Sequence, residues 1–556
     1  MTPVQDRAPS DSSASSSKSD STAPARAWLT LGLILVVAAV LRFWGTTFGL
    51  PGHYRPDEEY LIGTAKRVLA GEFNPGFFLY PSLYSYVLGG VFVAFRSLGE
   101  WCGFFGAEGF DVFVARGDDS LLYFIGRLTS ASLGTFGVLA IYSFGKRLFG
   151  REVGLLSSVL AALSFVHIRE SHYATTDSLM TLLVTLSLSA LVAITQRGRT
   201  RDYAWASLFC GLAISAKYTA AALVVPYALA HLGRLVRERR PPWSTRTVLQ
   251  WLLGGLVVLA TFSATSPYFF VEWEVVKQQF AYQRPFITGG LPGVDMDYGL
   301  AWLFGFALRY GVGMGLMILA ALGMGVAIWR ARFEGRRDLS SLAAIGLLVT
   351  LGWTFSSSRW IFLRYIDPFV PVLCVFAALS AVVLGRAVSS RAAGLVACVS
   401  VLAVSADPLG RAVDLNRLLS RVDTREILRA WREHHLETRE EIVIHSDFYY
   451  GKPGPYYGRY VLWTNFGPER RRESFPLVID AHPIRYYCPF PQPEVAEIVA
   501  RRGRLLVDID PFVAGSPAVD VYDQLDAFFA PVDGFAAVRS PGPRLRLYRV
   551  LPRIGE

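Results

Sequence analysis

Charged side chains are scarce in this chain. Only 18% of its 556 residues are charged, whereas 52% are hydrophobic, the mean hydropathy is +0.34 and 50 residues are glycine. A soluble protein of this size needs a more polar surface, so the composition excludes a soluble enzyme. It predicts an all-α polytopic membrane bundle.

Cysteines and clustered metal ligands are also lacking. The five cysteines show no metal-ligand spacing, and several fall in apolar runs, where a thiol behaves as a small hydrophobic side chain. His167, His172 and Asp177 are separated by gaps that do not place three ligands on one face of a helix. We therefore expect no disulfide framework, no metal and no cofactor.

The excess of positive charge lies in short clusters between apolar runs. A formal net charge of +10 would suggest nucleic acid in a soluble protein, but clusters of this kind are typical of topology signals in a membrane protein. They occupy every second loop, which places them and the N-terminal tail in the cytoplasm and the intervening loops on the outer face. The clusters begin at Lys146, Arg197, Arg234, Arg330 and Arg386.

Apolar runs divide the chain into three parts. Residues 1–26 are rich in Ser, Asp, Ala and Pro and are expected to be a disordered cytoplasmic tail. Residues 27–409 contain about eleven apolar runs, several of them short for a full span. The first run, residues 27–48, is too long for a signal peptide and lacks its cleavage pattern. Residues 410–556 contain no further span.

The C-terminal part is expected to be a small α/β or α+β domain on the outer side. Its composition is charged and mixed, and residues 425–434 have the pattern of an amphipathic helix. A loop rich in Tyr, Pro and Gly follows at residues 449–460. Strand-like runs occupy residues 441–444, 504–508 and 545–550.

The first outer loop, residues 49–80, is acidic and carries Arg55-Pro56-Asp57-Glu58-Glu59-Tyr60. Carboxylates are costly near lipid and do not help helices to pack, so they indicate chemistry at the membrane surface. The helical spacing from Asp57 to Ala70 predicts an interfacial amphipathic helix, with Pro56 in its first turn. The helix dipole favours the ionised forms of Asp57 and Glu58. The alternative to a chemical role is that these acids only cap the helix.

One apolar segment does not fit the alternation of basic and non-basic loops. Counting Pro81 to Leu98 as a single crossing would put the Lys146 cluster outside and Asp177 inside, against the charge bias. We therefore expect this segment to lie in the membrane plane, to be re-entrant, or to pair with the stretch from Trp101 to Phe113.

Five short motifs follow the acidic loop along the chain. They are Arg127 to Ser130, Lys146 to Gly150, Ser171 to Asp177, Arg364 to Pro371 and Asp423 to Trp431. With these motifs and the acidic loop, the chain resembles the polyprenyl-phosphate-sugar-dependent glycosyltransferases, which include protein O-mannosyltransferases and the lipid A aminoarabinose transferase. One departure is that Tyr80-Pro81-Ser82-Leu83 stands where such enzymes often have Lys-Pro-Pro-Leu, so a lysine for the lipid phosphate is missing there.

The resemblance implies transfer of a sugar from a lipid phosphate through an oxocarbenium-like state. One base and one phosphate clamp suffice for this reaction. We assign Asp57 as the base, with Glu58 as the neighbour to test next, because only one of two adjacent helical residues faces the sugar. Arg364 is the phosphate clamp, and the alternative is an arginine that snorkels to the interface. We expect Lys217 to bind the phosphate beside Arg364. The alternative is that the two apolar runs flanking Lys217 form one bent helix, in which Lys217 pairs with an acid.

Four further residues are candidate substrate contacts. Asp177 could hold sugar hydroxyls or cap the next helix. Tyr60 could stack on the sugar, although interfacial tyrosines are usually belt residues. His172 and Tyr365 lie within the motifs that carry the resemblance.

We therefore predict a membrane glycosyltransferase that moves a sugar from a polyprenyl-phosphate carrier to a protein, lipid or glycan acceptor, and the resemblance implies inversion of the anomeric centre. Its partners are the lipid donor, the acceptor and the membrane, and not nucleic acid. The expected location is the bacterial inner membrane, with the active site on the periplasmic side. The alternatives are a transporter, which should show internal repeats, and a non-enzymatic component of envelope-polysaccharide assembly.

Overall fold

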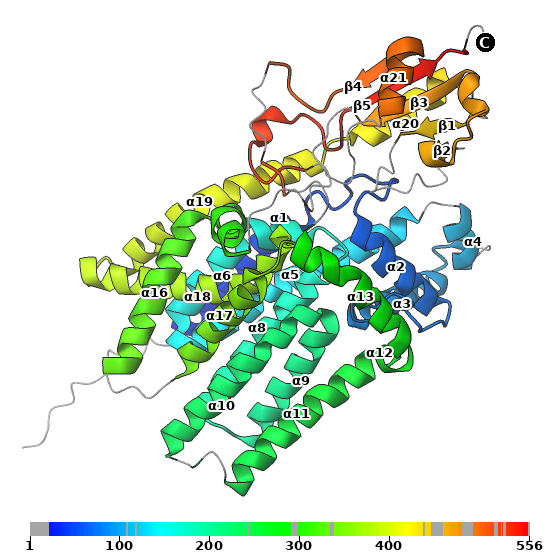
Figure 1. Cartoon of the computed structure of the whole chain (residues 1–556). Coiled ribbons are helices and arrows are strands. Elements are labelled where there is room, and N and C mark those ends of the chain that lie inside the picture. Colours follow the sequence, from blue (N-terminus) through cyan, green and yellow to red (C-terminus); the bar gives the residue numbers. More distant parts are fainter. Residues whose placement is uncertain are drawn as a thin grey trace, which may run out of the picture.

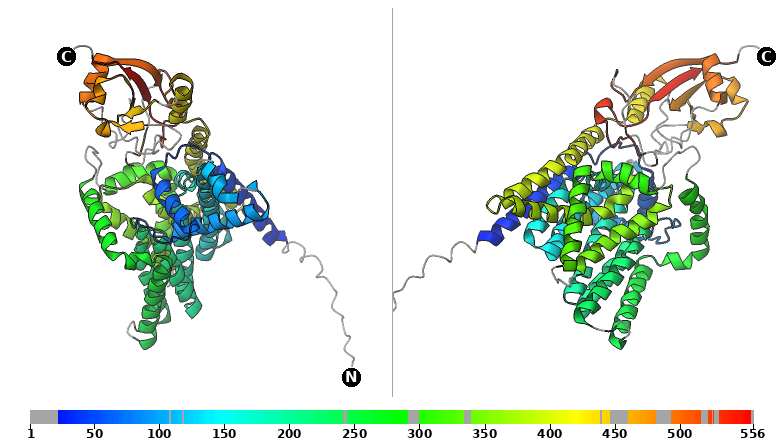
Figure 2. Two further views of the ribbon diagram at one scale, coloured as in Figure 1. Left: turned by 90° about the vertical axis from the view of Figure 1, so that its right-hand side faces the viewer. Right: turned by 60° about the vertical axis from the view of Figure 1, so that its left-hand side comes forward.

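A helical bundle lies beneath a small mixed sheet in the computed structural model of this chain (Figure 1). Figure 2 shows the same two layers from two other sides, with the sheet at the end of the molecule opposite α10 and α11. The structure describes residues 22–106, 109–116, 119–239, 241, 244–290, 299–333, 339–437, 440–445, 460–480, 493–515, 521–523, 525 and 530–553.

The first half of the bundle contains long helices joined by short breaks. The break after α9 carries a 3-10 turn, which we call η2. The elements are α1 (Thr22–Phe43), α2 (Pro56–Leu69), α3 (Leu83–Trp101), α4 (Gly109–Arg116), α5 (Ser120–Phe149), α6 (Arg151–Ala162), α7 (Phe165–Ser171), α8 (Asp177–Gln196), α9 (Thr200–Ala216), η2 (Tyr218–Leu223) and α10 (Val224–Glu238).

The second half has more interrupted helices. A π-helical stretch, η3, joins α14 to α15, and a 3-10 helix, η4, leads into α18. The elements are α11 (Thr245–Thr265), α12 (Tyr268–Val271), α13 (Trp273–Gly289), α14 (Gly299–Trp302), η3 (Leu303–Leu308), α15 (Arg309–Gly311), α16 (Met314–Phe333), α17 (Ser340–Ser356), η4 (Leu363–Phe369), α18 (Val370–Val388) and α19 (Ala393–Leu419).

The predicted multi-pass helical fold is confirmed, with fewer spans than expected. Among the described residues, 8 helices are long and apolar enough to cross a membrane, or up to 9 if α6 and α7 form one span bent by 61°. About eleven were predicted, because short apolar runs were counted as separate spans. The helix α9, for example, has only 17 residues. The 19-residue α3 is not among the 8, and its in-plane placement stays a prediction.

Two of the five basic clusters meet near the C-terminal end of α8. Arg147, at the end of α5, donates to the carbonyl oxygen of Ser189 in α8 at 2.6 Å. Arg237, near the end of α10, donates to the carbonyl oxygen of Gln196 at 2.9 Å. Since α8 begins at Asp177, the acidic and basic ends of the bundle are a helix length apart. This separation is what the alternating loop charges predicted.

The predicted C-terminal sheet is present, in an α+β arrangement. Parallel pairing joins β1 to β2 and β3, and antiparallel pairing joins β5 to β3 and β4, in the order β2-β1-β3-β5-β4. The predicted amphipathic helix is α20, whereas the loop at residues 449–460 lies almost wholly outside the described residues. The elements are α20 (Thr424–His435), β1 (Ile442–Ile444), β2 (Tyr460–Leu462), β3 (Phe475–Asp480), α21 (Pro493–Arg502), β4 (Gly503–Ile509) and β5 (Leu545–Val550).

Two predicted boundaries fall inside helices. The boundary between residues 409 and 410 lies within α19, which continues to Leu419 and leads directly to α20. The expected tail of residues 1–26 overlaps α1, which begins at Thr22, and residues 1–21 lie outside the described part. A helix does not stop where its apolar run stops, because backbone hydrogen bonds continue through polar residues.

Close packing of α16 on α18 depends on a residue without a side chain. A Cβ atom on Gly323 would lie 1.9 Å from the carbonyl oxygen of Phe376, whereas one on Gly325, on the same helix, would meet nothing within 4 Å. Small residues at such crossings allow helix backbones to approach each other.

We predict that Gly323→Ala lowers the free energy of unfolding by about 1–3 kcal/mol, because the two helices must move apart. Thermal unfolding of the purified full chain in detergent measures this loss. The matched control, Gly325→Ala, is expected to leave the midpoint unchanged or slightly raised, because alanine favours a helix more than glycine does. Equal midpoints for both variants would contradict the close approach.

Candidate active site

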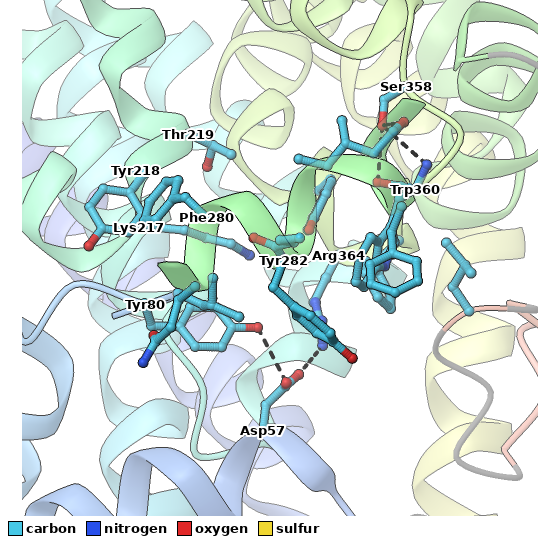
Figure 3. A pocket seen from close by; sticks show the side chains of 18 of the residues that line it. Asp57, Tyr80, Lys217, Tyr218, Thr219, Phe280, Tyr282, Ser358, Trp360 and Arg364 are labelled. Carbon is cyan, nitrogen blue, oxygen red and sulfur yellow. Dashed lines mark hydrogen bonds and ion pairs between the residues drawn. The ribbon is translucent and has the colours of Figure 1, made fainter. Parts of the chain in front are cut away.

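A cavity of about 880 Å³ opens between α2, the break after α9, α13 and η4 (Figure 3). It lies at the acidic end of the bundle, away from the basic clusters. Its lining is largely aromatic and amide, and the only charged members among the described residues are Asp57, Lys217 and Arg364. The predicted base and both predicted phosphate ligands therefore share one cavity.

Asp57 and Arg364 form an ion pair in the cavity wall (Figure 3). Asp57 lies in the first turn of α2, and Arg364 lies in the first turn of η4. The carboxylate is 19% exposed and the guanidinium only 4%, and the guanidinium also lies 4.2 Å from the centroid of the Phe362 ring. Arg364 is thus held within the protein and is not a snorkelling surface arginine.

Tyr80 supports Asp57 from the loop before α3. Its hydroxyl group donates to Oδ1 of Asp57 at 3.3 Å. Burial, together with the neighbouring negative charge of Asp57, raises the pKa of Tyr80 well above its usual range. Tyr80 therefore stays protonated at physiological pH and remains a hydrogen-bond donor.

Lys217 lies where the chain reverses direction. Its extended backbone, with φ −157° and ψ 130°, ends α9 and starts η2. Its Nζ lies 2.5 Å from Oδ1 of Asp177, the first residue of α8, and 4.8 Å from the centroid of the Tyr365 ring. Lys217 lines the cavity, and Asp177 stands behind it and is not among the lining residues. The two runs around Lys217 are separate helices, but the predicted pairing with an acid is also present.

Glu58 faces away from the cavity, into the protein. Its side chain is fully buried and accepts from Nε and Nη2 of Arg127 at 2.9 and 2.8 Å. It also accepts from the backbone N–H of Ala174 at 2.8 Å. Adjacent helical residues point about 100° apart, so this buried pair turns Asp57 toward the cavity. Glu58 was predicted as a second catalytic candidate, and its geometry is that of a residue that orients α2.

The other predicted contacts divide into two groups. Tyr60 and Tyr365 line the cavity, and the ring of Tyr60 stacks on Phe77 with the centroids 4.6 Å apart. His172 is fully buried outside the lining, with its ring nitrogens 2.7 and 2.8 Å from the carbonyl oxygens of Ile168 and Trp44. It therefore joins α7 to the end of α1.

One wall of the cavity, formed by α13, was not predicted from the sequence. The helix α13 contributes Gln278, Gln279, Tyr282, Gln283 and Phe286. Gln279 holds the loop between α2 and α3, accepting from the Phe78 backbone N–H at 2.7 Å and donating to the Gly76 carbonyl oxygen at 3.1 Å. The signal was the recurrence of amide and aromatic residues three or four positions apart, which places them on one helix face. In the described part of the chain, no group of three or more His, Cys, Asp or Glu could hold a metal ion.

Comparison with protein families gives one match within the bundle. Residues 122–268, from α5 to the start of α12, match the model of the dolichyl-phosphate-mannose-protein mannosyltransferases. The match confirms the predicted class: the chain is a membrane glycosyltransferase. The matched part of the transferase contains Asp177 and Lys217, while Asp57 and Arg364 lie outside it. Comparison with curated protein sequences gives no match.

Solved structures similar to the transferase are distant from it in sequence. ArnT from Cupriavidus metallidurans, bound to undecaprenyl phosphate, is 14% identical over 95% of this chain and 98% of that chain, with a TM-score of 0.49. The oligosaccharyltransferase AglB from Archaeoglobus fulgidus, in complex with an inhibitory peptide and a dolichol-phosphate, is 12% identical over 77% and 63%, with a TM-score of 0.47. The Pmt1-Pmt2 complex of S. cerevisiae, bound to the sugar donor, is 18% identical over 49% and 38%, with a TM-score of 0.35.

We predict that Glu58→Gln lowers the free energy of unfolding by about 3 kcal/mol, because it leaves the buried Arg127 guanidinium without its countercharge. The measurement is thermal unfolding of the transferase in detergent. Glu59→Gln, one residue further along α2 and partly exposed, serves as the control and is expected to change the midpoint much less. A midpoint for Glu58→Gln equal to that of the control would contradict an orienting role for the buried pair.

Proposed function

We propose that this transferase moves a sugar from a polyprenyl-phosphate carrier to an extracytoplasmic acceptor hydroxyl, with inversion at the anomeric carbon. The observation that supports it most directly is the ion pair of Asp57 and Arg364 in a cavity that also receives Lys217. One acid and two cations give the lining a formal charge of +1, which suits a phosphate. The family match over residues 122–268 supports the same class of donor.

The donor phosphate would bind between Arg364 and Lys217. A guanidinium holds phosphate oxygens in a fork, and an ammonium group adds a point charge. Each cation already has a carboxylate partner, since Arg364 pairs with Asp57 and Lys217 pairs with Asp177. Binding of the phosphate would draw Arg364 away from Asp57, so the arrival of the donor would release the base.

The released Asp57 would then act on the acceptor. Its carboxylate takes the proton of the acceptor hydroxyl as that oxygen attacks the anomeric carbon from the face opposite the phosphate. The bond from the anomeric carbon to the phosphate oxygen breaks with its electron pair, so the lipid phosphate leaves as an anion held by Arg364 and Lys217. A single displacement of this kind inverts the anomeric centre.

The remaining lining suits a sugar. Tyr60, Tyr282 and Trp360 offer ring faces, and Gln278 and Gln283 offer amide groups that match hydroxyls. Asp177 acts in this scheme through Lys217, and His172 acts by holding α7 in place. The acceptor is a protein Ser or Thr, a lipid-linked glycan or an envelope polysaccharide. We place the enzyme in a bacterial inner membrane, with the cavity on the periplasmic side.

We predict that Asp57→Asn lowers sugar transfer by about 10²–10⁴-fold, because the amide cannot take up the acceptor proton. The measurement is transfer of label from a panel of radiolabelled undecaprenyl-phosphate sugars to native membrane acceptors, at matched protein levels. Arg364→Ala, assayed in parallel, is expected to abolish transfer as well. Glu59→Gln is the control from the same helix and is expected to keep its activity. Full transfer by Asp57→Asn would remove Asp57 as the base.

Lys217→Gln gives a separate test of the phosphate site. We predict that it raises the KM for the lipid donor by roughly tenfold, because one charge-assisted contact to the phosphate is lost. Steady-state kinetics with varied donor concentration measures this change. Lys277→Gln, on the partly exposed side of α13, is the matched control and is expected to leave KM unchanged. An unchanged KM in Lys217→Gln would show that this lysine serves only to pair with Asp177.

A further inference from the structure

The chain leaves the sheet after β4 and returns to it at β5, and we call residues 510–544 between these strands the excursion. The excursion runs from the sheet toward the helical bundle (Figure 1). Leu525, from this excursion, is one of the lining residues. Leu525, Ala530 and Val532 are almost fully buried, and they belong to the hydrophobic core of the helical bundle rather than to that of the sheet. The excursion is therefore packed into the transferase bundle.

Asp523 joins this excursion to the element that carries Arg364. Its side chain is buried, with 1% exposure, and its Oδ2 accepts from the backbone N–H of Leu363 at 2.7 Å. Leu363 is the first residue of η4 and directly precedes Arg364. The first N–H groups of a helix have no partner within the helix, so an outside acceptor determines how the helix begins. Oδ1 of Asp523 accepts from the N–H of Leu525 at 3.2 Å, which fixes the carboxylate itself.

A second contact holds the same domain against the loop that leads into α2, the helix that carries Asp57. Tyr54, which is almost fully buried, donates its hydroxyl hydrogen to Oε1 of Glu426 in α20 at 2.5 Å. The guanidinium of Arg425 lies 3.5 Å from the centroid of the Tyr54 ring. The domain is thus anchored beside both members of the Asp57–Arg364 pair, at Tyr54 on one side and at Leu363 on the other.

We propose that Asp523 is a positioning residue for Arg364, so that the C-terminal domain completes the phosphate site of the bundle. This inference rests on the proposed role of Arg364 as the phosphate ligand. Without the carboxylate, the buried Leu363 N–H loses its acceptor, and η4 must shift or take water to satisfy it. A shift of the first turn of η4 moves the guanidinium relative to Asp57 and Lys217, which lie on other elements.

The test is a double-mutant cycle on binding of undecaprenyl phosphate, without sugar, to the full chain in detergent. We expect Asp523→Ala to weaken binding roughly tenfold, as loss of one buried hydrogen-bond acceptor implies. In the Arg364→Ala background, the same change is expected to weaken binding less than threefold further, because Asp523 acts through Arg364. Asp523→Asn keeps an acceptor oxygen and is expected to restore binding to within roughly threefold of wild type.

The outcomes separate this inference from the proposed function. Unchanged affinity in Arg364→Ala would reject the proposed phosphate contact and, with it, the positioning role. Weakened affinity in Arg364→Ala with normal affinity in Asp523→Ala would reject the positioning role alone. A tenfold effect of Asp523→Ala that persists in the Arg364→Ala background would also reject it, since general damage to the fold gives that result.

Two further variants keep the test decisive. If Asp523→Ala yields no folded protein, Asp523→Glu replaces it, because the longer side chain cannot keep the 2.7 Å contact without moving η4. Glu497→Ala, an exposed carboxylate in α21 of the same domain, is the matched control and is expected to bind undecaprenyl phosphate as wild type does. Normal binding by Asp523→Glu would contradict the proposal.

Discussion

The buried pair of Glu58 and Arg127 is the constraint on which the rest of the site depends. Arg127 donates to both carboxylate oxygens of Glu58 and also to the carbonyl oxygens of Thr46 and Phe48, so one side chain joins α2, α5 and the end of the first span. Breaking such a pair leaves a buried charge uncompensated, which is strongly unfavourable. The rotation of α2 is therefore set within the protein, and Asp57 faces the cavity as a consequence.

Charges at the site are kept in pairs. Asp57 with Arg364 and Asp177 with Lys217 each bring opposite charges together, which lowers the cost of holding four ionised groups beside a membrane. A phosphate is a stronger partner for a guanidinium than a single carboxylate is, because it offers more charged oxygens in a forked geometry. The pairing thus contributes to the stability of the site, and the proposed release of Asp57 by the donor phosphate depends on it.

Sequence reasoning succeeded where local patterns decide structure. The α2 helix with Pro56 in its first turn, the amphipathic α20 and the strands β1, β4 and β5 were predicted close to their observed bounds. The predictions failed where no local sequence pattern indicates the structure. The sequence of α13 has too little apolar periodicity to be recognised as a helix that lines a site. A short apolar run does not show whether the helix that contains it continues, bends or ends there. The burial of Glu58 and the exposure of Asp57 to the cavity depend on Arg127, which is 69 positions from Glu58.

The sequence by itself determined that this chain is a multi-pass membrane protein with an acidic loop after its first apolar run, and that Asp57, Lys217 and Arg364 lie at the same end of the bundle. Apolar run length and loop charge suffice for this, because the membrane constrains the length of each span and the charge of each loop separately, whatever the packing of the helices. Only the tertiary structure decided that Asp57 meets Arg364, that Glu58 is buried, and that Asp523 holds η4. These are contacts between residues far apart in the chain, and their geometry follows from how whole helices pack and rotate against one another.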